Sequence, residues 1–467
     1  MNRPLFTALA LLASLAGAQT LDRTKAPVSP PPRPYKLPPT FESRLPNGLT
    51  IVLAEDTRVP MITARLAFVA GNKKDPKDIP GLAGSLASML TQGTKNRTYK
   101  QLAEELDTIG ASITAVTSAD ALTINGSSLT ADAPRLLELM ADVARNATFP
   151  ADELALHIQN RKQSVTLQRG QPSYLANEEF RKRIYGDHAY GHVGPTMTAV
   201  DKVDQKILIA FRDTWIVPNN AYLILVGKFP ARAGMLRLIA AQFGSWQQKA
   251  LPASDNGKVP EPSRQIVIVD RPGSVQADVR IGRVAVSQTD KDYFAELMGS
   301  TIEGGGAHSR LFEDIREKKG FAYDAHTEPA AFAEGGLYSV VTQVRNEVVG
   351  EALEAVLGHM KLLTTEPVTK EELTDAKNSV NGFYLLRLEP QSGLANQLVG
   401  MKVMNLPKDY LETYTTKVNS VEPEQIQTTA KKYMEPGNSV IVVVGDASKI
   451  AEQVGKIGKV EIVKANQ

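Results

Sequence analysis

The stretch GLAGSLASMLTQGT, residues 81–94, predicts an early helix with two very different faces. Four apolar residues fall at helical spacing and form one buried stripe: Leu82, Leu86, Met89 and Leu90. The other face carries almost no side chain, because it consists of Gly84, Ala87 and Ser88. A glycine inside a helix costs about 0.5–1 kcal/mol relative to alanine, so this small-residue face needs a reason.

Composition limits the chemistry and the partners of the chain. The 467 residues are enough for two or more domains with large cores. Lys and Arg total 53 and Asp and Glu total 51, so the net charge of +2 indicates no nucleic-acid partner. The chain has no cysteine, which excludes disulfides and thiolate chemistry.

The N-terminus predicts export. Residues 1–18 have a short basic start, an apolar run and the small-residue cleavage site Ala16-Gly17-Ala18, as in a signal peptide. Residues 19–40 form a proline-rich tether, with seven prolines in 27–39. No other stretch approaches the length of a membrane span, so we expect a periplasmic or secreted protein without an integral membrane segment after signal removal.

The order of strands and helices predicts an internal duplication. Alternating strand patterns, such as the one at 62–71, precede the first helix, and the same order returns in the second half. Two landmarks recur about 218 residues apart: Val226-Gly227 with Val444-Gly445, and Glu153-Leu154 with Glu372-Leu373. We therefore predict an α+β protein of two homologous domains, 41–250 and 265–467, each a mostly antiparallel sheet flanked by helices, joined by the linker 251–264.

Two motifs carry a resemblance to a known family. The order strand, strand and G-L-A-x-x-L-x-x-M-L-x-x-G-T is similar to the first domain of the pitrilysin/insulinase-type zinc peptidases, the inverzincins. GGGAHSRLFEDIREKKGFAY, residues 304–323, resembles their second-domain signature. The resemblance covers nearly the whole chain from about Phe41, and it implies a clamshell arrangement of the two domains.

The zinc-binding residues of that family are missing here. Active members carry H-x-x-E-H on the first helix, with two histidine ligands and a glutamate that activates the zinc-bound water. The matching positions are Gly84, Ala87 and Ser88, which we interpret as a degenerate metal site. A further glutamate ligand is expected some seventy to eighty residues later, but residues 154–177 contain no Asp or Glu. Close helix packing is a compatible explanation of the small residues.

Other histidines do not replace this site. His188 and His192 lie four apart in GDHAYGH, a segment that resembles a loop common in the family. We therefore expect no metal and no cofactor on this chain, and zinc only on a partner subunit.

The second-domain signature, in contrast, is intact. Arg316 and Tyr323 lie seven apart, and the resemblance implies that such a pair contacts the substrate peptide opposite the zinc. A guanidinium and a phenol can both donate hydrogen bonds to a peptide carbonyl or oxyanion. The alternative is that Arg316 forms a surface ion pair and Tyr323 belongs to the core.

These features predict an exported, non-catalytic subunit of a heterodimeric metalloendopeptidase. It would bind peptide substrates through Arg316 and Tyr323 and complete the active chamber of a homologous zinc-bearing subunit, with no catalytic residue and no peptidase activity of its own. The alternative function is a non-enzymatic peptide-binding or assembly protein that acts alone or as a homodimer.

Overall fold

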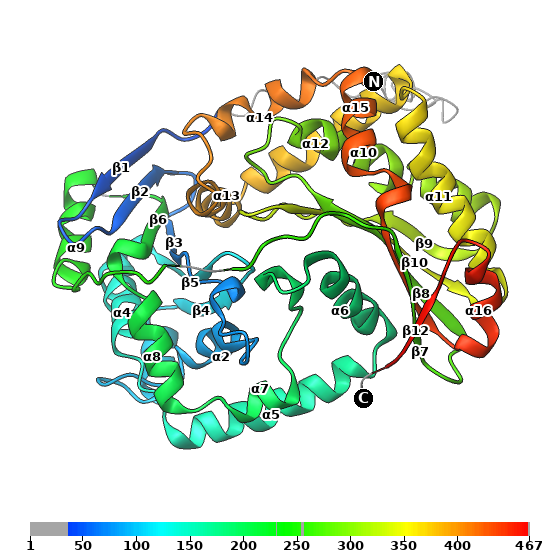
Figure 1. Ribbon diagram of the computed structural model, residues 1–467. Helices are drawn as coiled ribbons and strands as arrows, with labels where there is room; N and C mark the ends of the chain where they lie inside the picture. The colour runs from blue at the N-terminus through cyan, green and yellow to red at the C-terminus, as the bar shows by residue number, and fades with distance from the viewer. Residues whose placement is uncertain (1–35, 230, 254–255, 466–467) are drawn as a thin grey trace, which may run out of the picture. The chain divides into compact units, whose positions relative to one another are not determined.

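The computed structural model describes residues 36–229, 231–253 and 256–465 (Figure 1). The predicted signal peptide and most of the proline-rich tether lie outside these residues. Among the described residues, no helix is both long and apolar enough to cross a membrane.

The first half builds a six-stranded sheet in the order β1-β2-β6-β3-β5-β4. Its strands are β1 (Thr40–Arg44), β2 (Thr50–Glu55), β3 (Met61–Phe68), β4 (Ser112–Thr117), β5 (Leu122–Leu129) and β6 (Ala221–Gly227). The alternating residues of β3 that the sequence singles out (Ile62, Ala64, Leu66 and Phe68) are buried in the first hydrophobic core.

The second half builds a sheet in the order β12-β7-β11-β8-β10-β9. Its strands are β7 (Gln265–Asp270), β8 (Gln276–Ala285), β9 (Ala322–Thr327), β10 (Gly336–Arg345), β11 (Val440–Gly445) and β12 (Glu461–Lys464). A second core gathers on this sheet and includes Ala277, Val279 and Ile281 of β8.

Five of the six strands in each sheet have the same order and pairing directions in both sheets. β2 pairs parallel with β6, as β7 pairs parallel with β11, and the other core neighbours are antiparallel in both sheets. The sixth strand differs, since β1 is antiparallel to β2 whereas β12 is parallel to β7. The predicted fold class, α+β with two homologous domains and mostly antiparallel sheets, is confirmed.

The described residues of the first half also form helices. They are α2 (Leu82–Met89), α3 (Tyr99–Thr108), α4 (Ala133–Asn146), α5 (Ala151–Arg169), α6 (Pro172–Tyr185), α7 (Met197–Asp201), α8 (Gln205–Trp215) and α9 (Arg232–Phe243). Thr98 caps α3 in a capping box with Gln101, which satisfies backbone N–H groups at the start of the helix.

The helices of the second half follow the same order. They are α10 (Tyr293–Gly304), the π-helix η5 (Phe312–Lys318), α11 (Val349–Thr365), α12 (Lys370–Leu388), α13 (Gln391–Val403), α14 (Tyr410–Asn419), α15 (Pro423–Tyr433) and α16 (Ala447–Gly455). The long helices α5 and α12 are the equivalent pair marked by the Glu-Leu landmarks.

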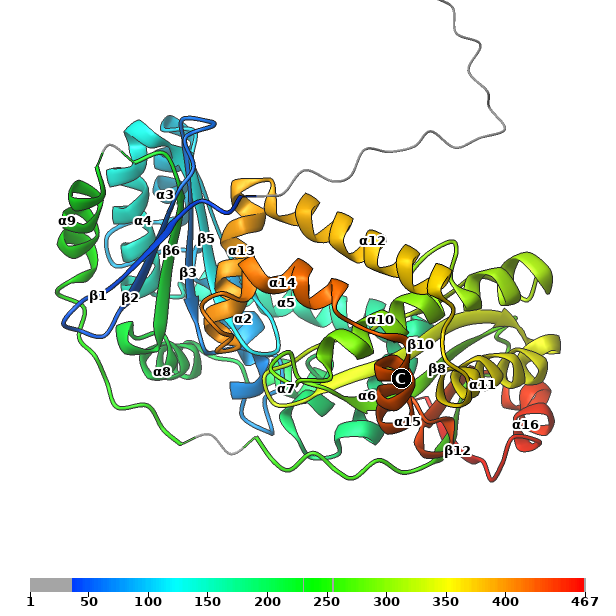
Figure 2. The ribbon, with the colours of Figure 1, turned by 90° about the horizontal axis from the view of Figure 1, so that it is seen from above.

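The halves exchange one helix each. Helix α6 packs against β8 and β11 of the second sheet, and α13 packs against β3 and β6 of the first (Figures 1 and 2). Phe180 and Tyr185 of α6 are fully buried in a cluster with valines of β7 and β11, and the Tyr185 hydroxyl donates to the Gly336 carbonyl oxygen at 2.9 Å. The Arg65 Nε of β3 donates to Asn396 Oδ1 of α13 at 2.8 Å. Each sheet is therefore covered on one face by a helix from the other half.

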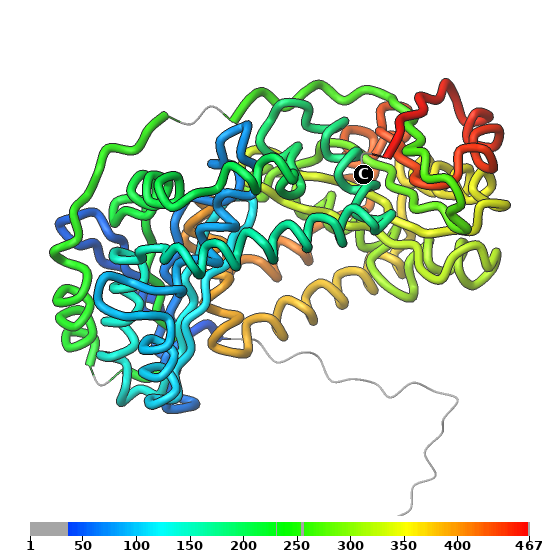
Figure 3. Tube along the Cα trace, turned by 90° about the horizontal axis from the view of Figure 1, so that it is seen from below, coloured from blue at the N-terminus to red at the C-terminus, as the bar shows by residue number. Residues whose placement is uncertain are grey.

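Between α9 and β7, the described residues 244–253 and 256–264 form no helix or strand (Figure 3). The carbonyl at Asn256 accepts the Ala189 N–H at 2.8 Å, so part of the predicted linker is held against the loop after α6.

Candidate functional site

Helix α2 carries the degenerate metal positions beside the edge strand β4. Its apolar stripe, including Leu82, Leu86 and Met89, is buried in the first core and holds the helix in place. Ala87 is buried as well, whereas the exposed Ser88 donates its hydroxyl to the Gly84 carbonyl oxygen at 3.0 Å. None of the three altered positions presents an imidazole or a carboxylate.

The start of α2 is anchored by a carboxylate from the preceding loop. Asp75 accepts the Gly81 N–H and the Ala83 N–H, each at 2.7 Å. Burial raises the pKa of Asp75 to about 7, although both hydrogen bonds act against this rise. Gly81 has φ of +90°, a conformation that glycine adopts readily, and this lets the chain turn into the helix.

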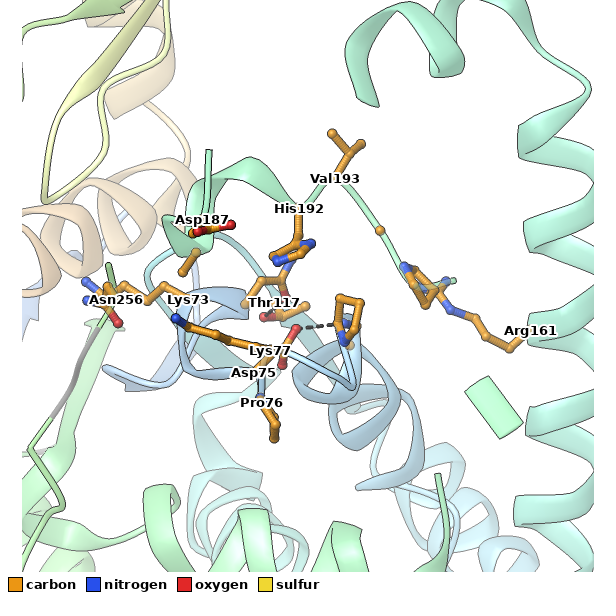
Figure 4. Close-up of a pocket in the computed structure, with 17 residues that line it drawn as sticks. Lys73, Asp75, Pro76, Lys77, Thr117, Arg161, Asp187, His192, Val193 and Asn256 are labelled. Carbon is orange, nitrogen blue, oxygen red and sulfur yellow. Dashed lines mark hydrogen bonds between the residues drawn. The ribbon is translucent and has the colours of Figure 1, made fainter. Parts of the chain in front are cut away.

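A cavity of about 90 Å³ opens beside Gly84 (Figure 4). The loop before α2, the end of β4, helix α5 and the segment after α6 supply its walls. Its polar side chains are Asn72, Lys73, Asp75, Lys77, Thr117, Arg161, Asp187, His192 and Asn256.

Arg161 of α5 reaches toward Gly84. A Cβ atom at position 84 would lie 3.9 Å from Arg161 Nη2 and 3.7 Å from Thr117 Cγ2, so there is room for a methyl group but the guanidinium borders that space. Arg161 Nε is buried, and no described residue offers it a hydrogen-bond acceptor. Arg161 was not predicted as a site residue. The one feature in the sequence that could have indicated it is its place in a segment, residues 154–177, that contains no acidic residue.

These residues do not fit a zinc ion. Among the described residues, no three His, Asp or Glu side chains come close enough together to hold a metal. The nearest charged group to the Gly84 position is a guanidinium, which repels a divalent cation. We therefore derive no metal-dependent step for this chain.

The two histidines of GDHAYGH have separate surroundings. His188 is buried, accepts the Tyr190 N–H on Nδ1 at 3.1 Å, and has Nε2 3.4 Å from Glu334 of the second half. Burial lowers the pKa of His188. His192 is exposed and borders the cavity beside Gly84. The two side chains are thus not a ligand pair.

A buried polar network around His188 was not predicted from the sequence. Lys73 Nζ lies 2.7 Å from Asp120 Oδ1 and 3.3 Å from Glu334 Oε1. The Tyr190 hydroxyl donates to Asp120 at 2.7 Å, and Asp120 also accepts the Ala333 N–H at 3.2 Å. Because Ala333 and Glu334 belong to the second half, these contacts join the two halves.

Arg316 of η5 and Tyr323 of β9 are brought together at the edge of the second sheet. The Arg316 guanidinium carbon lies 4.7 Å from the centre of the Tyr323 ring and 4.6 Å from that of Phe312, in cation–π geometry. Tyr323 is 83% exposed, so it is not a core residue, and Arg316 Nε has a weak contact with Glu317 at 3.3 Å. The pair presents a guanidinium and a phenol to solvent.

The strand that carries Tyr323 is the edge of its sheet. β9 pairs with β10 on one side and is the last strand of the order, while β4 is the corresponding edge of the first sheet. The two candidate regions occupy different elements: α2 packs on β4, α5 and α8, and η5 packs on β9 and α11.

Comparison with known proteins identifies the family of the chain. The family model described as "Insulinase (Peptidase family M16)" matches residues 50–192, and "Peptidase M16 inactive domain" matches residues 202–380. Two similar relatives are uncharacterized zinc proteases: one from Mycobacterium leprae, 23% identical over 87% of this chain and 92% of its own, and one from Bacillus subtilis, 20% identical over 83% and 93%.

Solved structures show the same fold. A peptidase M16 inactive domain from Pseudomonas fluorescens is 27% identical with a TM-score of 0.81, over 87% of this chain and 98% of that one. A protease from Helicobacter pylori has a TM-score of 0.82 at 21% identity, over 87% of this chain and all of that one.

The duplicated sheets and the exchanged helices define a two-domain α+β protein with the peptidase M16 fold. The chain belongs to peptidase family M16, the insulinase family.

Proposed function

We propose that this chain is an exported, non-catalytic subunit of a heterodimeric metalloendopeptidase. It binds peptide substrates and completes the active chamber of a homologous subunit that carries the zinc. One observation carries the proposal: α2 offers no metal ligand at Gly84, Ala87 and Ser88, while Arg316 and Tyr323 are assembled and open to solvent.

The free strand edges support peptide binding. An extended peptide adds to an exposed sheet edge through main-chain hydrogen bonds, which do not depend on its sequence. On β9, a peptide would lie beside Tyr323, whose stacked partner Arg316 donates to carbonyl groups. The similarity to a structure titled as an inactive M16 domain is consistent with a chain that does not cleave on its own.

Reconstitution tests the proposal. The mature chain is mixed with an M16 homologue from the same genome that carries intact H-x-x-E-H, and cleavage of a quenched fluorescent peptide is followed. Activity that appears only in the mixture, together with a 1:1 complex on size-exclusion chromatography, is the expected result. A zinc-bearing homologue that is fully active alone and does not bind this chain would overturn it.

Export is tested separately by locating the tagged chain in cell fractions and sequencing the mature N-terminus. Cleavage after Ala18 and recovery outside the cytoplasm are expected. An uncleaved chain in the cytoplasm would contradict this part of the proposal. Peptide binding by the chain alone, without any partner, would favour the alternative of an independent binding or assembly protein.

A further inference from the structure

We infer that the cavity beside Gly84 binds the carboxylate group of a peptide, with Arg161 as its anchor. This inference rests on the proposed peptide-binding function and adds a chemical preference to it. At the position where the resemblance implies a metal ion, the guanidinium of Arg161 borders an open cavity.

The charges of the cavity favour an anion. Lys73 is engaged by Asp120 and Glu334, and Asp75 is engaged by two backbone N–H groups. Within residues 36–229, 231–253 and 256–465, no carboxylate forms an ion pair with Arg161 or Lys77. Among the described carboxylates that line the cavity, only Asp187 has neither an ion pair nor a backbone N–H partner. Its side chain is exposed and lies on the same side of the cavity as His192 and Asn256 (Figure 4). The guanidinium of Arg161 and the ammonium group of Lys77 therefore share the cavity wall with one exposed acid, Asp187.

The hydrogen-bond donors in the cavity wall also favour a ligand that accepts hydrogen bonds. The Thr117 hydroxyl donates to Asn72 Oδ1 at 3.1 Å, which fixes the carbonyl side of that amide. No described residue accepts a hydrogen bond from the Asn72 amide nitrogen or from the buried Arg161 Nε. An ionised carboxylate is an acceptor only, so it complements a wall that offers hydrogen-bond donors without a protein partner.

The space is sufficient for this ligand. A volume of about 90 Å³ holds several water molecules, and so a carboxylate with its first carbon atoms fits. Gly84 keeps this space open, since any side chain larger than a methyl group would extend toward Arg161.

Binding of labelled peptides to the mature chain, alone and in complex with the zinc-bearing homologue, tests the inference. One pair of peptides ends in a free carboxylate or in an amide and has no acidic side chain. A second pair has an amidated end and an internal Glu or Gln. Fluorescence anisotropy compares the affinities, and the pair that shows a preference for the acid identifies the source of the carboxylate.

Three variants sharpen the test. Arg161→Gln is expected to lower the affinity for the acid form about 10- to 100-fold and to leave the amide form unchanged, because a hydrogen-bonded charge pair is lost. Gly84→Glu should have the same effect by supplying a carboxylate within the chain. Lys162→Gln, on the same helix but paired with Asp201 on the surface, is the matched control and should change neither affinity.

The outcomes separate this inference from the proposed function. If no peptide binds the wild-type chain or its complex, the proposed function fails. If peptides bind but acid and amide forms bind equally, or Arg161→Gln and Gly84→Glu leave the preference intact, the carboxylate site is wrong and peptide binding stands. Circular dichroism of each variant shows that it is folded, and Gly84→Glu decides the result if Arg161→Gln does not fold.

Discussion

Helices α2 and α10 occupy equivalent places in the two halves, but only α10 buries acidic side chains. Each follows the second core strand of its half, β3 or β8. Helix α2 contains no acidic residue, whereas α10 buries Glu296 and Glu303. The duplicated fold tolerates both because the apolar residues of each helix hold it on its own core.

The acids of α10 lie in an apolar setting. The Tyr338 hydroxyl donates to Glu303, and Ser300 contacts Glu296 at 3.5 Å. Burial raises the pKa of Glu296 to about 8 and that of Glu303 to about 7, so both carboxyls bind protons near neutral pH. The difference shows that the same place in the two halves accepts small uncharged side chains in one helix and buried acids in the other.

The largest predicted effect is the loss of peptidase turnover when Arg316 or Tyr323 of the second half is replaced. In an active complex with the zinc-bearing subunit, Arg316→Ala or Tyr323→Phe should lower turnover about 10²–10³-fold while assembly is preserved, because one donor to the substrate carbonyl is lost. Lys318→Ala, on the same π-helix, is the control. Wild-type rates in both assembled variants would leave Arg316 and Tyr323 without a role in the reaction.

The next largest effect concerns the buried acids of α10. Since the folded chain holds a proton on Glu296 that the unfolded chain loses above the ordinary pKa of 4.5, the free energy of unfolding should fall as pH rises from about 5 to 8. The slope is up to about 1.4 kcal/mol per pH unit for each such group. Glu296→Gln, which cannot ionise, should make this profile shallower in denaturant melts, while Glu303 keeps part of the slope.

The exposed Glu354 of α11 offers the control, because Glu354→Gln removes a carboxylate from the surface. This variant should keep the wild-type profile. A Glu296→Gln variant with an unchanged pH profile would show that Glu296 is ionised in the folded chain.

Replacing a glycine by alanine in each of the two helices should have opposite effects on the stability of the chain. Gly84→Ala should stabilise the chain by about 0.5–1 kcal/mol, because its new methyl group meets no atom closer than 3.7 Å and alanine favours the helix. Gly304→Ala, at the end of α10, should destabilise it, because its Cβ would lie 2.4 Å from the Thr327 nitrogen. Thermal unfolding compares them, and a stabilised Gly304→Ala variant would contradict the packing described for α10.

The smallest effect is expected from restoring the motif on α2. The triple variant Gly84→His, Ala87→Glu and Ser88→His should gain neither stoichiometric zinc nor peptidase activity, because Arg161 borders the site and residues 154–177 offer no glutamate ligand. Elemental analysis checks the variant and the wild-type chain, for which we also expect no bound zinc. Robust chelator-sensitive cleavage by the variant would show that the distal ligand had been misplaced.

The sequence alone was enough to predict the elements with a regular apolar period and the repetition of their order. The alternation in β3 and the helical stripe in α2 depend on neighbouring residues, so their periods were enough to predict strand, helix and buried face. The small side chains at Gly84, Ala87 and Ser88 and the spacing of Arg316 and Tyr323 were also visible, since each lies within one short segment.

Which elements pack against each other could be seen only in the folded chain. The apolar residues of α6 fit either sheet by pattern alone, and packing places Phe180 and Tyr185 on the sheet of the other half. Arg161 lies 77 residues beyond Gly84, and no periodicity could show that its guanidinium borders that glycine. Local patterns report the preferences of single segments, whereas contacts between distant segments depend on how the whole chain fills its two cores.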